Sequence, residues 1–559
     1  MRRQRRRLVL LLGVVLLLAA CSGGEAAAPE QDTQSDTTTS SAPLLDPETS
    51  DDTAPASGTL RWAIGPPDEI IPTLATTRDG LRVVDALFES LTRLDEDLEP
   101  LPGAASSWRS SPGADVWTFT LRPGATFHDG SPVTAADVKF AWEEAVRRGR
   151  IPPYLADVRG YDALVSGEAD ELDGVLARGE RTLQLVLDRP RADLPVVVAH
   201  PSLAPIPQQQ YERDPEAFAE EPIGNGPFRA DEGWVRDRFV RLSVAQGPPG
   251  SRATVDEVLF RVVDPASGYI AFQQGRVDIA TVPDGALEDA IDRFGESIDG
   301  HTGPGVLRGE AGELSMLAMD VDAAPFDDVA VRRALSFAVD RQRLIDEVVP
   351  DGNAAPARGV ASDRLPGGQV SACSTCLHAP DAAARIFSEQ AVDSLTVWLD
   401  ADGGRAEAVG ERLTADFAEV GVALTVEQAP FGEVLEAIED EQASLFGYGW
   451  VADHPTAEDM LVPLLSSASQ GVATGNPGGY HNVEVDDLID EALATSDAEE
   501  RYALLREAET IAVGREQAVI PLFVPQHRLV VGERVGEFVL EPTGRADLTR
   551  VRIDPGATE

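Results

Sequence analysis

The sequence predicts an α/β protein with more than one domain, and three observations lead to this prediction. The chain has 559 residues, which is more than a single hydrophobic core usually organises. Hydrophobic residues make up 43% of it and charged residues 25%, which is enough apolar material for packed cores. Strand patterns and helix patterns also alternate along the chain. We therefore expect two or three α/β domains.

Strand patterns in the first half of the body are short and end in turn-forming residues. They are expected at residues 60–64, 117–121 and 182–187. A helix is expected over residues 134–148, because Thr134 can cap it and Asp137 lies three residues further on, as in a capping box.

The second half shows a strand, a helix and another strand in succession. The strands are expected at residues 395–399 and 422–426, and the helix between them has apolar residues on one face. This order predicts a βαβ unit. Two long helices are also expected, over residues 329–348 and from Asp486 to about Val513.

The charge of the chain argues against nucleic acid as a partner. Lys and Arg number 47 while Asp and Glu number 95, which gives a formal net charge of -48. Binding to phosphate backbones requires clustered basic residues that release counterions. We therefore expect no nucleic-acid partner.

The first twenty residues have the layout of an export signal. Five arginines precede an apolar run from Leu8 to Leu18, and Ala19, Ala20 and Cys21 follow. The four residues Leu18-Ala19-Ala20-Cys21 resemble the bacterial lipobox, in which the cysteine receives a lipid. We expect residues 1–20 to be a lipoprotein signal peptide and Cys21 to be the lipidated N-terminus. An ordinary secretory signal, cut nearby, is the alternative.

Residues 21–57 are rich in Ser, Thr, Asp, Ala and Pro and almost lack large apolar groups. Such a segment cannot bury enough surface to offset the entropy of ordering, so we expect a disordered tether. A lipid and a tether would hold the body at the outer face of the cytoplasmic membrane. No later stretch of the sequence is long and apolar enough to span a bilayer.

Chemical motifs of common enzymes are missing from the sequence. It contains no P-loop, no His-Glu-x-x-His and no Gly-x-Ser-x-Gly, and its seven histidines are scattered. We therefore expect no catalytic residues, no metal site and no cofactor. A hydrolase is a remote alternative.

Cys373 and Cys376 are the remaining cysteines of the exported chain. An exported location favours a disulfide between them. A redox pair, or a zinc site using the nearby His378, are the alternatives.

One run carries a strong resemblance to a known family. Residues 121–138, Leu-Arg-Pro-Gly-Ala-Thr-Phe-His-Asp-Gly-Ser-Pro-Val-Thr-Ala-Ala-Asp-Val, resemble the signature of the family 5 extracellular solute-binding proteins, the peptide and nickel receptors of ABC importers. Further marks follow in family order, at residues 222–228, 275–280, 331–341, 449–455, 482–486 and 520–522. We expect most of these marks to be structural, with turns at Pro123 and Gly124 and a close backbone approach at Gly224 and Gly226.

The resemblance implies a two-lobed periplasmic-binding-protein type II fold with an extra domain inserted in the first lobe. Ligand would bind in a cleft between the lobes. The implied division is a first lobe of residues 58–98, 209–310 and 519–559, an extra domain of residues 99–208 and a second lobe of residues 311–518.

The resemblance also implies where ligand is recognised. In peptide-binding relatives the aspartate of the Gly-Trp-x-x-Asp motif pairs with the ligand's α-ammonium, and the matching residue here is Asp453. Trp450 would shape the pocket, and His454 lies beside the aspartate. The alternative is structural: Asp453 would cap the helix that begins near Ala457, and Trp450 would belong to the core.

The implied function is capture of short peptides and their delivery to an ABC permease with its ATPase subunits. The alternatives differ either in the cargo or in the class of protein. The same receptor could carry an oligosaccharide, a metal chelate or another amine, and His454 beside Asp453 is the only histidine that favours the chelate. The protein could also be a ligand-free regulatory lipoprotein of the envelope.

Overall fold

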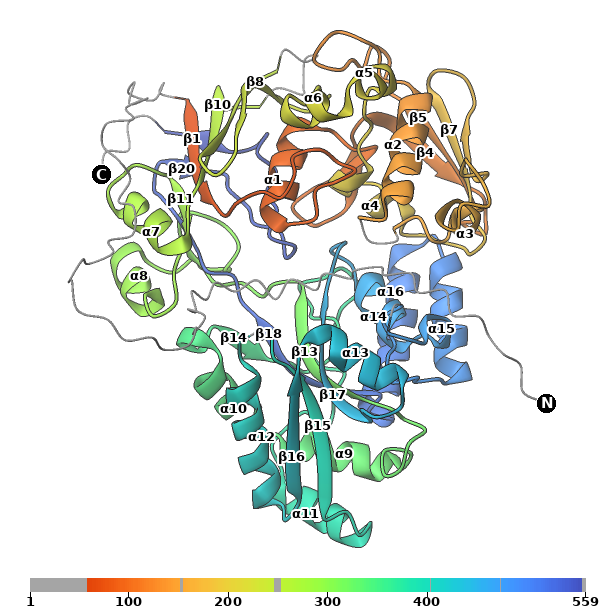
Figure 1. Ribbon diagram of the computed structural model, residues 1–559, viewed down its shortest axis with the longest axis vertical. Coiled ribbons are helices and arrows are strands. Elements are labelled where there is room, and N and C mark those ends of the chain that lie inside the picture. Colours follow the sequence, from red (N-terminus) through yellow and green to blue (C-terminus); the bar gives the residue numbers. More distant parts are fainter. Residues whose placement is uncertain (1–57, 151–153, 246–252, 403, 473, 555–559) are drawn as a thin grey trace, which may run out of the picture.

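The structure is a computed structural model that describes residues 58–150, 154–245, 253–402, 404–472 and 474–554. The expected signal peptide, Cys21 and the tether lie outside these residues. The molecule has two lobes, each built on a mixed sheet, and a smaller sheet packed beside the first (Figure 1). Within the described part of the chain, no helix is long and apolar enough to cross a membrane.

The first lobe is built on a seven-stranded sheet with the order β12-β19-β11-β1-β10-β9-β8. β1 runs parallel to β10 and β11, while the outer pairs are antiparallel. Its strands are β1 (Thr59–Ile64), β8 (Phe228–Val235), β9 (Phe239–Val244), β10 (Glu257–Val262), β11 (Ile279–Thr281), β12 (Gly305–Leu307) and β19 (Leu529–Val531). Its helices are α1 (Arg78–Leu87), α7 (Pro265–Gln273) and α8 (Leu287–Phe294). The strand predicted at 60–64 is confirmed as β1.

The extra domain has a four-stranded antiparallel sheet with the order β4-β5-β7-β6. Its elements are β4 (Ala105–Ser110), β5 (Val116–Leu121), α2 (Ala135–Arg148), α3 (Tyr161–Val165), β6 (Val175–Ala177), β7 (Thr182–Val186) and α4 (Leu194–Val197). The capping box predicted for α2 is present, because Thr134 and Asp137 bond reciprocally. A small hairpin of β2 (Thr92–Leu94) and β3 (Pro100–Pro102) precedes this domain, and α5 (Gln208–Arg213) and α6 (Pro215–Glu220) follow it.

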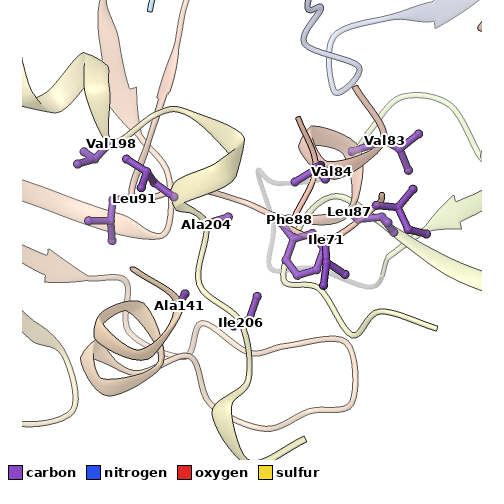
Figure 2. Packing of buried hydrophobic residues seen from close by; sticks show 14 of the residues in the cluster. Ile71, Val83, Val84, Leu87, Phe88, Leu91, Ala141, Val198, Ala204 and Ile206 are labelled. Carbon is purple, nitrogen blue, oxygen red and sulfur yellow. The ribbon is translucent and has the colours of Figure 1, made fainter. Parts of the chain in front are cut away.

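One hydrophobic core runs through the first lobe and the extra domain (Figure 2). Val83, Val84 and Leu87 of α1 belong to the same cluster as Ala141 of α2 and Ile206, which lies before α5. The second lobe has a separate core. A continuous close-packed core resists relative movement, so the first lobe and the extra domain form one body.

The second lobe is built on a six-stranded sheet with the order β14-β18-β13-β17-β15-β16. Its strands are β13 (Glu313–Met319), β14 (Ala354–Pro356), β15 (Ser394–Asp400), β16 (Ala423–Ala429), β17 (Leu445–Val451) and β18 (Val519–Pro525). Its helices are α9 (Val329–Ala338), α10 (Arg341–Val348), α11 (Pro380–Glu389), α12 (Ala406–Glu419), α13 (Phe431–Glu439), α14 (Ala457–Leu465), α15 (Val483–Ala494) and α16 (Ala498–Glu509). The βαβ unit is confirmed, since β15 and β16 are parallel and α12 connects them. Cys373 and Cys376 form a disulfide in this lobe.

The two long helices predicted from apolar periodicity are wrong. Each is two helices, because an aspartate caps a new helix inside the predicted span. Asp340 accepts from the N–H of Arg343 at 3.1 Å and begins α10, and Asp497 accepts from the N–H of Glu500 at 3.0 Å and begins α16. The apolar spacing continues across both breaks, so periodicity alone did not reveal them.

Two short connections join the lobes, at residues 308–312 and 526–528. They run side by side: the N–H of His527 donates to the oxygen of Gly309, and the N–H of Ala311 donates to the oxygen of Pro525, both at 2.9 Å. The expected return to the first lobe at residue 519 comes later in the structure, because β18 pairs with β13 and β14 in the second lobe. A continuous apolar strand indicates burial without indicating which sheet it joins.

The glycine-rich run at 222–228 packs against the end of α1. The N–H of Gly226 donates to the oxygen of Leu87 at 2.9 Å. A Cβ atom on Gly226 would lie 2.6 Å from the carbonyl carbon of Leu87, closer than Cβ atoms occur in proteins. The expected close backbone approach is therefore present.

We predict that Gly226→Ala lowers the free energy of unfolding by about 1 to 3 kcal/mol, because backbone must move to admit the methyl group. Gly432→Ala is the control: nothing lies within 4 Å of a Cβ atom there, in α13, and a helical alanine is favoured. Urea denaturation compares the two. A Gly226→Ala protein as stable as the control would contradict the packing argument.

Candidate ligand-binding site

Asp453 lies in the loop between β17 and α14, where the second lobe meets the extra domain. Its carboxylate accepts a hydrogen bond from the hydroxyl of Tyr154, a residue of the extra domain that is 7% exposed. The loop that leads to α14 therefore meets the opposing body at this carboxylate.

Three aromatic rings surround this contact. The ring centroids of Tyr154 and His200 are 4.5 Å apart, those of Tyr154 and His454 are 4.9 Å apart, and those of the two histidines are 5.5 Å apart. The Tyr154 hydroxyl also lies 3.3 Å from Nε2 of His200. Burial lowers the pKa of both histidines well below its usual value, so both rings are neutral at pH 7.

Asp459 shapes the loop that carries Asp453. One of its carboxylate oxygens accepts from the N–H of Asp453 at 2.7 Å and from the N–H of His454 at 3.3 Å. The cap of α14 is Thr456, whose hydroxyl accepts from the N–H of Asp459. The alternative that Asp453 caps this helix is therefore wrong, and its carboxylate is left for another contact.

Trp450 braces the same loop from the second-lobe side. Its indole nitrogen donates to the backbone oxygen of Asp459 at 2.8 Å, and its partly buried ring packs against the second-lobe core. This contact links the end of β17 to α14. A role of the ring in shaping a ligand pocket stays a prediction.

The carboxylates of Asp453 and Asp459 have no ion-pair partner within 4.0 Å among the described residues. Burial raises the pKa of Asp453 well above its usual value, and the neighbouring charge of Asp459 raises it further. The Tyr154 hydrogen bond and the more distant Arg545 act in the opposite direction. Burial raises the pKa of Asp459 to about 6, against the effect of Arg191. The site is therefore short of positive charge.

Further contacts hold the extra domain against the second lobe. The N–H of Ala192 donates to the oxygen of Leu493 in α15 at 2.8 Å. Arg189 lies 3.7 Å from Asp490 of the same helix. The loop before α4 therefore rests on α15.

Two cavities of the described part of the molecule lie away from this site. One of 1060 Å³ is bounded by the first lobe, the extra domain and the C-terminal segment 541–550, and one of 410 Å³ lies beside the two connections. Asp453, Trp450 and His454 line neither. No group of three or more His, Cys, Asp or Glu residues in the described ranges could hold a metal ion.

Sequence reasoning missed Tyr154, His200 and Arg545 at this site. These residues stand alone in the sequence, outside the family marks. Tyr154 and His200 belong to the extra domain and Arg545 to the C-terminal segment, and they come near Asp453 only where this body packs on the second lobe. No local signal marks them.

We predict that Asp453→Asn stabilises the unliganded protein at neutral pH. The raised pKa means that the folded state binds a proton more tightly than the unfolded state, so this carboxyl costs stability as pH rises above about 4. Asparagine carries no charge, so the melting temperature at pH 7.5 should rise by about 2 °C or more and the difference should vanish near pH 4. Asp292→Asn, at an exposed position of α8, should change little. An equal or lower melting temperature for Asp453→Asn at pH 7.5 would contradict the charge argument.

Sequence comparison places the chain among known receptors. Residues 99–471 match the family described as bacterial extracellular solute-binding proteins, family 5 Middle. The chain is 26% identical over 527 residues to the dipeptide-binding protein DppE of Bacillus subtilis (strain 168), covering 90% of this chain and 93% of the relative. It is 25% identical over 456 residues to the glutathione-binding protein GsiB of Salmonella typhimurium, covering 79% of this chain and 84% of the relative.

Structural comparison agrees on the fold. The unliganded open form of MppA, a periplasmic murein tripeptide binding protein, matches with a TM-score of 0.75 at 21% identity, covering 89% of this chain and 97% of that one. The predicted two-lobed type II fold is confirmed. Since the family match covers more than half of the chain, this protein belongs to the family 5 bacterial extracellular solute-binding proteins.

Proposed function

We propose that this protein is the lipid-anchored receptor of an ABC importer and that it captures short peptides between its lobes. The similarity to proteins named for binding a dipeptide and glutathione supports peptide as the cargo. The permease and its ATPase subunits are the partners that this role requires. The receptor carries out no chemical step on its cargo.

The observation that carries the proposal is the partly buried carboxylate of Asp453, which has no cation within ion-pair distance among the described residues. A peptide's α-ammonium supplies one positive charge and three N–H donors. A charge-assisted hydrogen bond of this kind contributes roughly 1.5 to 3 kcal/mol in a site from which water is excluded. Loss of the bond would weaken binding about tenfold or more.

Ligand entry requires the contact between Asp453 and Tyr154 to separate. The two connections at residues 308–312 and 526–528 are the covalent links about which the lobes can move. On closure the ammonium takes a place beside Asp453, and the neutral His454 and Trp450 lie on the second-lobe side of the ligand. Backbone hydrogen bonds along the peptide then allow varied side chains.

We predict that Asp453→Asn weakens binding of a tripeptide with a free N-terminus by tenfold or more, measured by isothermal titration calorimetry. N-acetylation of the peptide should cause a similar loss in the natural protein and little further loss in the variant, because both changes remove the same ion pair. Asp292→Asn is the control and should bind as the natural protein does. Unchanged affinity in Asp453→Asn would remove this residue from the site.

The anchor is tested separately. We predict that Cys21→Ala leaves the protein out of the membrane fraction, because no thiol remains to carry the lipid. Intact-mass measurement of the natural protein should show a lipid on Cys21. A Cys21→Ala protein that stays with the membrane would contradict lipid anchoring without affecting the peptide proposal.

A further inference from the structure

The 1060 Å³ cavity is bounded by segments that are far apart in the sequence. The end of α1, the β2–β3 hairpin, the loop at 122–130, the glycine-rich run at 225–229 and the C-terminal segment 541–550 all line it. Its volume is at the upper end of what small-molecule sites enclose. Phe88, Leu94, Leu101 and Phe127 give it apolar walls.

Most carboxylates in the cavity wall are already engaged. Glu89 pairs with Arg122 at 2.6 Å, and Glu541 pairs with Arg545 at 3.1 Å. Asp547 lies 3.7 Å from Arg93. Asp95 accepts two backbone N–H groups, both through the same oxygen.

Asp85 differs from all of them. This residue of α1 lines the cavity and is partly buried, yet none of the described residues gives its carboxylate a hydrogen bond or an ion pair. The charges that act on it are Arg545, which favours its ionised form, and Glu541 and Asp547, which oppose it. Burial is the largest influence and raises its pKa to about 7. Among the described residues that line the cavity, Asp85 is thus a carboxylate with no ion-pair partner within 4.0 Å, and Arg545 acts on it only from a greater distance.

We propose that this cavity is a second binding site, which accepts a small molecule with an apolar body and one ammonium or guanidinium group, and that Asp85 pairs with that cationic group. The apolar walls receive the body of the molecule. The bound cation supplies the ion-pair partner that Asp85 lacks, because a carboxylate removed from water needs a cation or hydrogen-bond donors beside it.

This site is separate from the one at Asp453. Asp453, Trp450 and His454 do not line the cavity, and no residue of the second lobe does. The charge of Arg545, which lines the cavity, acts on both Asp85 and Asp453. The cavity can therefore be filled without separating Tyr154 from Asp453.

The test uses 4-phenylbutylamine as the probe and 4-phenylbutan-1-ol as its neutral counterpart, both titrated into the full extracellular chain by calorimetry. The amine should bind at least tenfold more tightly than the alcohol. Asp85→Asn should remove that preference. Asp95→Asn is the matched control: it removes another charge from the same cavity, and its remaining oxygen can still accept both backbone bonds. The affinity of Asp95→Asn for the amine should lie within twofold of that of the natural protein.

Measuring the protons released on binding distinguishes an ion pair with Asp85 from a change in the shape of the cavity caused by the substitution. Because the pKa of Asp85 is raised to about 7, part of the population is protonated at pH 7 and must lose its proton when the cation binds. Titration in two buffers of different ionisation enthalpy should show proton release by the natural protein and none by Asp85→Asn. Affinity should rise from pH 6 to pH 8.

Three results would overturn the proposal. They are no amine binding at millimolar concentration, equal amine affinity in Asp85→Asn, or loss of amine binding in Asp453→Asn with Asp85→Asn unaffected. The last result would place the amine at the proposed peptide site. Failure of peptide binding in Asp453→Asn leaves the amine experiment unchanged, so the two proposals fail separately.

Discussion

The architecture depends on the paired connections between the lobes. Residues 308–312 and 526–528 run antiparallel and share hydrogen bonds, and Asn353 donates to the oxygen of Gln526 at 2.8 Å beside them. The first lobe and the extra domain share one core, while the second lobe has its own. The molecule therefore consists of two rigid bodies joined by one narrow bridge. Every other contact between them is noncovalent and can separate.

Where the two bodies meet away from the bridge, the interface is built from groups that are costly to bury. The carboxylate of Asp453, which has no ion-pair partner among the residues the structure describes, meets a tyrosine and two neutral histidines. Apolar side chains there would hold the bodies together more firmly. A polar, charge-deficient interface suits a receptor, because a ligand that supplies the missing charge makes the closed arrangement more stable than it is alone. In this account the cost of burying Asp453 in the empty protein is part of binding specificity.

Much of the fold could be predicted from the sequence, and the reasons for success and failure are physical. The capping box at Thr134, the βαβ unit around α12 and the close approach of Gly226 to Leu87 depend on residues near in sequence or on a motif, so local patterns revealed them. The breaks at Asp340 and Asp497 were missed because an aspartate cap leaves the apolar spacing intact. The position of β18 in the second-lobe sheet depends on pairing between distant strands, which periodicity does not encode.

The residues of the candidate site could likewise be predicted only in part. The Gly-Trp-x-x-Asp motif led to Asp453, but its partners Tyr154, His200 and Arg545 lie in segments whose contact depends on how the bodies pack. Asp85 was also missed, because a single aspartate on a helix becomes distinctive only when a cavity opens beside it.

The central claim is that the interlobe site takes a cationic peptide terminus. Native mass spectrometry of the chain from residue 22 onward, purified gently and then denatured to release its small molecules, tests this claim most directly. The account predicts peptides of a few residues with free N-termini. Release of a sugar or a metal chelate, or an empty protein that also refuses a peptide library, would contradict it.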